Sequence, residues 1–168
     1  VIPVEAYLPQ NSNSHEVLRQ ISEFSGLERL TINNDEFVYL DLKKFKNLKR
    51  IKLNHTNNLK SLDISDLENL EYLKITSTNG SLESIDGLAS LKNLKTLHLF
   101  SHQSMGPIDL RPLLSLESLD LSMHMDHSKT LDLDGLINLK KIRLCLTGLE
   151  NLRLNGLENL LEIHIVNA

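Results

Sequence analysis

The chain has 168 residues, of which 40% are hydrophobic, 24% are charged and 4% are aromatic, and its net charge is −4. The length suits one domain or one short repeat array, and the apolar content excludes a disordered chain. No apolar run approaches about 18 residues, so we expect no membrane-spanning segment and no membrane partner. The single cysteine excludes an intrachain disulfide, and the acidic balance gives no overall attraction to nucleic acid.

The first 26 residues are predicted to form an N-terminal cap (residues 1–26) of one strand and one short helix. Apolar residues alternate over residues 2–8, which predicts the strand. Ser14 is placed to cap a helix over residues 15–24, and Gly26 is placed to end it. The sequence begins at Val1 without a signal-peptide pattern, so we expect a processed protein or an excised fragment, either cytoplasmic or secreted without disulfides.

From residue 27 onward, one leucine-rich pattern recurs. The pattern Leu-x-x-Leu/Ile-x-Leu/Ile is found seven times at steps of 21 to 24 residues, and it starts at Leu27, Leu48, Leu70, Leu94, Leu116, Leu139 and Leu160. A second alternating pattern lies between the copies, as FVYLDL, LKSLDI, LESIDG, PIDL, TLDLDGL and LENLRL. Leucine supplies 37 of the 168 residues, which indicates one packing environment used many times.

The spacing predicts a stack of short strands. A single copy cannot bury its apolar side alone, so neighbouring copies must stack. Alternation in the first half of each copy predicts a short strand, and stacking these strands gives a parallel sheet along one face. Alternation in the second half predicts short extended segments, rather than helices, along the opposite face.

Residues 27–168 resemble the leucine-rich repeat family. Residues 139–159 meet its 21-residue unit in full, the nested L-x-x-L-D-L half is similar to short bacterial repeats, and residues 81–94 are similar to the repeats of internalins. The resemblance implies a right-handed leucine-rich-repeat solenoid with a parallel β-sheet on the concave face and short extended segments or turns on the convex face, behind a helical N-terminal cap. We expect seven repeats over residues 27–168, the last one incomplete, and no C-terminal cap.

Asparagine occupies an unusual place in these repeats. The family usually has Asn at the ninth position, which here holds Asp35, Thr56, Thr78, His102, His124 and Thr147. Asn instead precedes the repeat start, as Asn47, Asn69, Asn93, Asn138 and Asn159, with Ser115 as the exception. We interpret these five residues as a ladder of side chains that satisfies buried backbone groups at the other bend.

The register assigns the side chains that face solvent on the concave face. Each strand has three outward positions, and together these positions hold six Lys or Arg residues and two acids. The convex segments carry acids instead, namely Asp41, Asp63, Asp86, Asp109 and Asp132. We interpret the concave face as a basic groove for an acidic partner surface. The alternative is that exposed strand positions are simply polar and that the imbalance of sign is chance.

Tyr72 and Phe100 are the only aromatic residues predicted on this face, and basic residues flank them. The composition is typical of interaction hot spots, although Phe100 could instead cover an irregular turn. Longer turns over residues 76–80, 100–107 and 122–130 are predicted to project along the rim. The hypothetical partner-binding residues are Arg50, Lys52, Tyr72, Lys74, His98, Phe100, Asp120, Lys141 and Arg143.

Other chemistry receives little support from the residues. The histidines at positions 98, 102, 124 and 127 lie near Asp120 and Asp126, yet their spacing matches no metal motif, and we expect solvated turn residues and no metal. The convex aspartates need no calcium if each bonds its own turn. Cys145 has no evident base, a flat sheet offers no pocket, and no glycine-rich phosphate loop occurs, so we expect neither an enzyme nor a cofactor.

The function that we predict is protein–protein recognition through the concave face and the rim loops of repeats 3–5. One alternative is a structural spacer segment of a larger surface or effector protein. Another is nucleic-acid binding by the basic face, against which the acidic back and the scarce aromatic residues argue. The uncovered layer at the C-terminal end also offers a surface for self-association.

Overall fold

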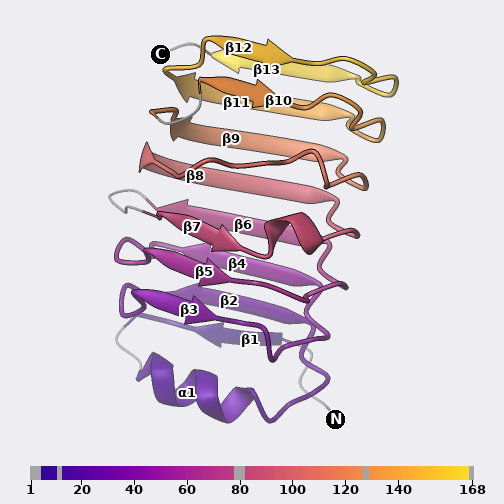
Figure 1. Cartoon of the computed structure of the whole chain (residues 1–168). Helices are drawn as coiled ribbons and strands as arrows, with labels where there is room; N and C mark the ends of the chain where they lie inside the picture. Colours follow the sequence, from indigo (N-terminus) through magenta and orange to yellow (C-terminus); the bar gives the residue numbers. More distant parts are fainter. Residues whose placement is uncertain (1–4, 11–12, 78–81, 127–128, 167–168) are drawn as a thin grey trace.

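The structure is a computed structural model that describes residues 5–10, 13–77, 82–126 and 129–166. Its largest feature is an eight-stranded parallel sheet, which rises as one stack from the N-terminal to the C-terminal end (Figure 1). In spatial order its strands are β1 (Glu5–Leu8), β2 (Arg29–Asn33), β4 (Arg50–Asn54), β6 (Tyr72–Ser77), β8 (Thr96–Ser104), β9 (Ser118–His124), β11 (Lys141–Thr147) and β13 (Glu162–Val166). We call the solvent-facing side of this sheet the front face.

The opposite side, which we call the back face, carries the shorter elements and is turned toward the viewer in Figure 1. β3 (Tyr39–Asp41), β5 (Ser61–Asp63) and β7 (Ser84–Asp86) form a three-stranded sheet, and β10 (Thr130–Asp132) and β12 (Asn151–Arg153) form a two-stranded sheet. The 3-10 helix η1 (Leu88–Ser90) follows β7, and α1 (Ser14–Ile21) lies at the N-terminal end. The predicted solenoid is confirmed, and five of the six convex segments are strands.

The core lies between the two faces and is built almost entirely from Leu and Ile. Neighbouring front strands stack their inward residues in register, as Leu30 on Ile51 and Ile51 on Leu73. These side chains are completely or almost completely buried in every internal repeat. Burying one such side chain stabilises the fold by about 1.5–3 kcal/mol. The abundance of leucine therefore reflects one inward environment that each repeat fills again.

The N-terminal helix starts one residue earlier and ends three residues earlier than predicted. Asn13, not Ser14, is its cap residue, because the Asn13 side chain accepts a hydrogen bond from the backbone N–H three positions on. Ser14 is buried, and its hydroxyl accepts a hydrogen bond from Asn34 Nδ2 at 2.6 Å. The helix ends at Ile21, so Gly26 does not end it. The strand predicted beside the helix is confirmed as β1, although residues 2–4 of that prediction lie outside the described residues.

The predicted asparagine ladder is confirmed, although its hydrogen bonds are exposed rather than buried. Each Asn donates from Nδ2 to a backbone carbonyl of the preceding repeat, and four of the five distances are 2.7–3.1 Å. In order, Asn47, Asn69, Asn93, Asn138 and Asn159 bond the carbonyls of Ser25, Lys46, Glu68, Leu114 and Ile137. Ser115 leaves one step of the ladder open, at the position equivalent to the carbonyl of Lys92.

The sixth convex segment, residues 106–110, is not a strand, and the back face is divided there. Elsewhere the first residue of a back strand donates to the preceding repeat, as Ser61 N–H does to the Val38 carbonyl. The equivalent residue here is Pro107, which has no N–H. In the repeat before it, Gly87 is an added residue with φ +87°, after which η1 turns the chain away. No backbone hydrogen bond between described residues joins residues 106–110 to β7.

Completing the asparagine ladder should stabilise the protein. In Ser115→Asn the new side chain can donate to the Lys92 carbonyl, and one added hydrogen bond contributes about 0.5–1.5 kcal/mol. Urea unfolding followed by circular dichroism measures the change. Ser115→Ala is the control and should bring no gain. Equal stability of the two variants would show that the ladder contributes nothing at this step.

The two left-handed glycines Gly87 and Gly135 should respond differently to alanine. Both have positive φ, +87° and +79°, so each substitution carries a backbone cost of about 1–2 kcal/mol. A Cβ on Gly87 would lie 2.4 Å from the Ser65 Cα, whereas a Cβ on Gly135 meets nothing within 4 Å. Gly87→Ala should therefore lower the free energy of unfolding by at least about 1 kcal/mol more than Gly135→Ala. The same urea experiment measures both, and equal losses would contradict the close approach at Gly87.

Candidate recognition surface

The front face presents its side chains in three columns that cross the strands, in the predicted register. From β2 to β13 the columns are Arg29, Arg50, Tyr72, Thr96, Ser118, Lys141, Glu162, then Thr31, Lys52, Lys74, His98, Asp120, Arg143, His164, and then Asn33, Asn54, Thr76, Phe100, Ser122, Cys145, Val166. All nine candidate residues therefore lie on one face. β1 adds Glu5 and Tyr7 to the first two columns, so Tyr7 is a third aromatic residue there. Continuing the alternation of residues 5–8 into the repeat register would have found both.

Five of the nine candidates form one connected cluster across β4, β6, β8 and β9. The guanidinium carbon of Arg50 lies 3.7 Å from the centroid of the Tyr72 ring. The ring centroids of Tyr72 and His98 are 5.6 Å apart, and His98 stacks on Phe100 at 6.3 Å. His98 Nδ1 lies 3.6 Å from the carboxylate of Asp120. Phe100 is thus part of the face rather than the cover of a turn, and these contacts hold the rings in place.

The other four candidates border this cluster. Lys52 and Lys74 precede His98 in the second column, and Lys141 and Arg143 stand on the strand after Asp120. A shallow hollow lies on the same face, lined chiefly by His98, Ser118, Asp120, Lys141, Arg143 and Glu162. The small side chain of Ser118 leaves this space between its larger neighbours.

Cations on the front face differ from the others in their ion pairing. Eleven of the 18 Lys and Arg residues pair with a carboxylate within the described chain. On the front face only Lys141 does so, at 3.8 Å from Glu162. The front-face cations without a carboxylate partner among the described residues are Arg29, Arg50, Lys52, Lys74 and Arg143. Away from this face, only Lys44 and Lys92 share that condition.

His98 is held neutral by its position in the cluster. Burial among its neighbours lowers the pKa of His98 below 6.5, because the charged imidazolium loses hydration. The carboxylate of Asp120 acts in the opposite direction, while the charges of Lys74 and Arg143 lower the pKa further. The cluster therefore presents an uncharged imidazole between aromatic rings at neutral pH.

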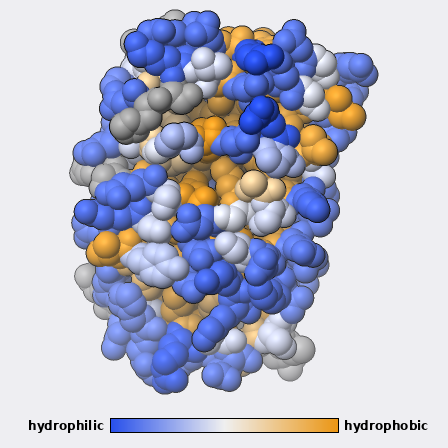
Figure 2. All heavy atoms as spheres, viewed as in Figure 1, coloured by the Kyte–Doolittle hydropathy of each residue, from blue (hydrophilic) through white to orange (hydrophobic). Residues whose placement is uncertain are grey.

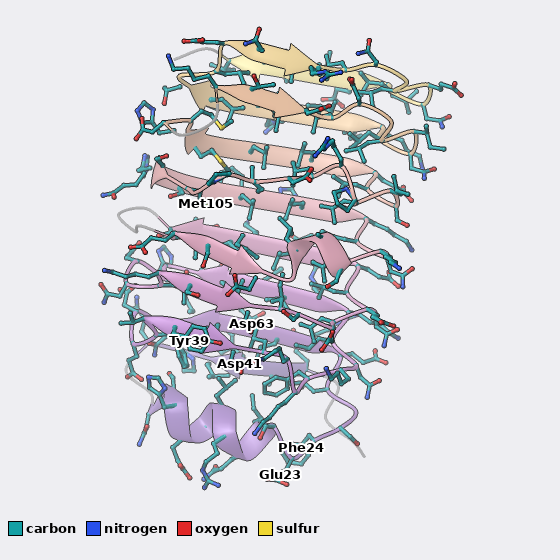
Figure 3. The ribbon with its side chains drawn as sticks, viewed as in Figure 1. Glu23, Phe24, Tyr39, Asp41, Asp63 and Met105 are labelled. Atoms are coloured by element: carbon teal, nitrogen blue, oxygen red, sulfur yellow. The ribbon has the colours of Figure 1, made fainter. Side chains whose placement is uncertain are left out.

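The acidic back is neutralised locally, which the sequence did not reveal. Four of the five convex aspartates accept a hydrogen bond from the backbone N–H two residues on, at 2.9–3.1 Å; they are Asp41, Asp63, Asp109 and Asp132. Lys43 lies 3.6 Å from Asp41 and 3.2 Å from Asp63, and Arg111 lies 2.9 Å from Asp109. Asp41 and Asp63 point outward from neighbouring strands (Figure 3). The asymmetry between the faces thus lies in pairing as well as in charge.

The rim predicted as loops consists largely of strand. Residues 100–104 belong to β8, where a register shift between Phe100 and Ser104 absorbs the irregular length, and residues 122–124 belong to β9. The alternation simply continues, because Met123 and Met125 are buried. His124 is fixed by Thr147 Oγ1 and by Asp126, which lies 2.9 Å from its Nε2. Residues 78–80 of the first predicted loop lie outside the described residues.

The histidines singled out in the sequence do not converge. His98 lies in the front cluster and His124 at the rim, His102 is exposed, and His127 lies outside the described residues. Within the described part of the chain, no group of three or more His, Cys, Asp or Glu side chains could hold a metal ion. Cys145 is a half-buried free thiol in the third column. No helix in the described residues has the length and apolarity needed to span a bilayer.

A ladder of alternating charge was missed in the sequence. The residue after the first Leu of each repeat alternates in sign, as Glu28, Lys49, Glu71, Lys95, Glu117 and Lys140. Ion pairs join these residues two by two, at 3.0, 3.4 and 2.9 Å. The strict alternation at one repeat position is the signal that could have found it. Because these pairs are exposed, each contributes about 0–1 kcal/mol, and they leave no charge free for a partner.

The neutral state of His98 predicts a pH dependence of stability. Since the folded pKa of His98 is below its ordinary value of 6.5, the unfolded chain binds the proton more readily. The stability that depends on neutral His98 is complete above pH 6.5 and is lost as the pH falls from 6.5 through the folded pKa. In His98→Gln the free energy of unfolding should vary less over this range. Urea unfolding between about pH 7.5 and 5 measures the two slopes, and equal slopes would contradict the assignment.

Comparison with solved structures places the fold among known proteins. A leucine-rich-repeat protein of Leptospira interrogans matches 97% of this chain at 21% identity, with a TM-score of 0.52, and an internalin (inlF) of Listeria monocytogenes matches 88% at 19% identity, with a TM-score of 0.45. The chain spans about half the length of these two proteins, 54% and 57%. Neither the protein-family models nor the curated proteins gave a match. On the first of these likenesses, together with the strand topology, the chain has the leucine-rich-repeat fold, a repeat fold of the protein-interaction type that is typically non-enzymatic.

Proposed function

We propose that this chain is a protein-recognition module that binds an acidic surface of a partner protein through its front face. The fold, which is of the protein-interaction type, supports this role in general terms. The observation that carries the specific proposal is the row of front-face cations without carboxylate partners. An acidic partner can pair with them without breaking an existing ion pair, so the attraction is not offset by a lost internal contact.

The aromatic cluster gives this surface its centre. Tyr72, His98 and Phe100 are half-buried and already packed against one another, so little side-chain freedom is lost when a partner covers them. Tyr and Arg are enriched at binding hot spots, and Arg50 already lies over Tyr72. Asp120 is the acid beside His98 within this cluster and offers a partner one opposite charge that fixes its orientation.

Reversing two front-face charges should abolish recognition. The double variant Lys52→Glu, Lys74→Glu places two carboxylates in the second column, next to the cluster, and should weaken binding of the natural partner by about tenfold or more at low salt. The partner is isolated from the native source on the immobilised chain. Its affinity for each variant is then measured by surface plasmon resonance at two ionic strengths.

The matched control is Lys44→Glu, Lys92→Glu. It changes the net charge by the same amount at the two other cations that have no carboxylate partner, both exposed and both outside the front-face columns. It should leave the affinity unchanged. Equal loss in both double variants would indicate general attraction, and no loss in either would rule out the front face. Retention of no protein by the wild-type chain would favour a structural spacer.

A further inference from the structure

The divided back face exposes core that the other internal repeats bury. The middle residue of an internal back strand is buried in Leu40, Leu62 and Leu131, with 2% exposure or less. The equivalent residues beside the division, Ile85 and Ile108, are only half-buried. The difference follows from Pro107 and Gly87, which part the chain on the two sides of the gap.

This gap is a small apolar hollow. It has a volume of about 300 Å³, and its floor includes Ile85, Leu88, Ala89, Met105 and Ile108. Met105 reaches it from the end of the rim, on the back side of β8 (Figure 3). Figure 2 shows hydrophobic surface in a recess at mid-height of this face, within a mainly hydrophilic surround. A space of this size lies at the lower limit for ligand pockets, so it accommodates one bulky side chain rather than a whole ligand.

Acidic residues alone charge the rim of the hollow. Its lining holds Glu83, Asp86 and Asp109 and no Lys, Arg or His. Asp109 is paired with its neighbour Arg111, and Glu83 has only a long contact of 3.9 Å to Lys60. Asp86 has no ion pair and no side-chain hydrogen bond to another described residue. The local field therefore favours a cationic occupant, in contrast to the front face.

A strand edge borders the same hollow. β7 pairs with β5 along one side only, and Ser84, Ile85 and Asp86 line the hollow along the other. An unpaired edge of this kind offers backbone donors and acceptors to an extended segment. The neighbouring residues 106–110 do not use them, because Pro107 cannot donate.

We infer that this back-face hollow is a second docking site, which takes an extended segment of a partner protein that places one bulky apolar side chain between lysines or arginines. The apolar residue fills the space over Ile85 and Ile108. The flanking cations meet Asp86 and Glu83, and the segment runs along the open edge of β7. The site is independent of the front face and prefers the opposite charge.

The test uses two short peptides as probes. Acetyl-KVKFKVK-amide has alternating apolar and basic residues, and acetyl-EVEFEVE-amide has the same apolar residues with acidic neighbours. In ¹⁵N–¹H NMR titrations the basic peptide should bind saturably and shift the amides of residues 83–89 and 105–109. The acidic peptide should bind at least about tenfold more weakly. Shifts spread over all back-face acids, or equal binding of both peptides, would overturn the proposal.

A matched pair of variants at Ala89 examines the charge preference without disturbing the core. Ala89 is exposed in η1 at the edge of the hollow, so both Ala89→Lys and Ala89→Glu should fold, as thermal unfolding would confirm. Ala89→Lys should weaken the basic peptide about fivefold or more, and Ala89→Glu should not. No change in either variant would place the peptide elsewhere. Lys52→Glu, Lys74→Glu should bind this peptide normally, so failure of this site and failure of the front face are separable.

Discussion

One constraint governs the whole molecule: no repeat can bury its apolar side without the next one. The inward positions of successive repeats must therefore coincide, as Leu30, Ile51 and Leu73 do, and the strands must pair in register. The outward positions are then aligned by the same pairing, at the strand spacing of about 4.8 Å. The front-face columns are thus a by-product of core packing. A residue type that recurs at an outward position becomes a continuous row.

Such rows make the sign of each charge consequential. Opposite charges in neighbouring repeats neutralise one another, as Lys49 and Glu28 do. Like charges in neighbouring repeats repel, and Lys52 and Lys74 stand directly beside each other in the second column. Their repulsion disfavours the folded state slightly and is relieved when an anion lies across both. The front face therefore gains from a partner what it lacks within the chain, whereas the alternating ladder at the strand starts gains nothing.

Sequence reasoning could predict whatever repeats and failed where a repeat departs from its pattern. The spacing of leucines was enough to assign the strands, the inward residues and the columns. The contacts of Arg50 over Tyr72 and of His98 with Phe100 depend on rotamers, which spacing does not determine. The rim was misjudged because polar residues around Met123 hide the continued alternation. The local partners of Asp41 and Asp63 were missed because Lys43 lies outside the repeated positions.

The division of the back face also has a mechanical meaning. Between repeats 3 and 4 the back strands are not hydrogen-bonded, and Ser115 leaves the asparagine ladder open at the same junction. Only the front sheet, through β6, β8 and β9, continues without a break. A stack joined along one side bends most easily about that side, so the solenoid consists of two stiffer halves with a hinge under His98. Bending there changes the curvature of the front face at its aromatic centre, and it widens or narrows the gap behind.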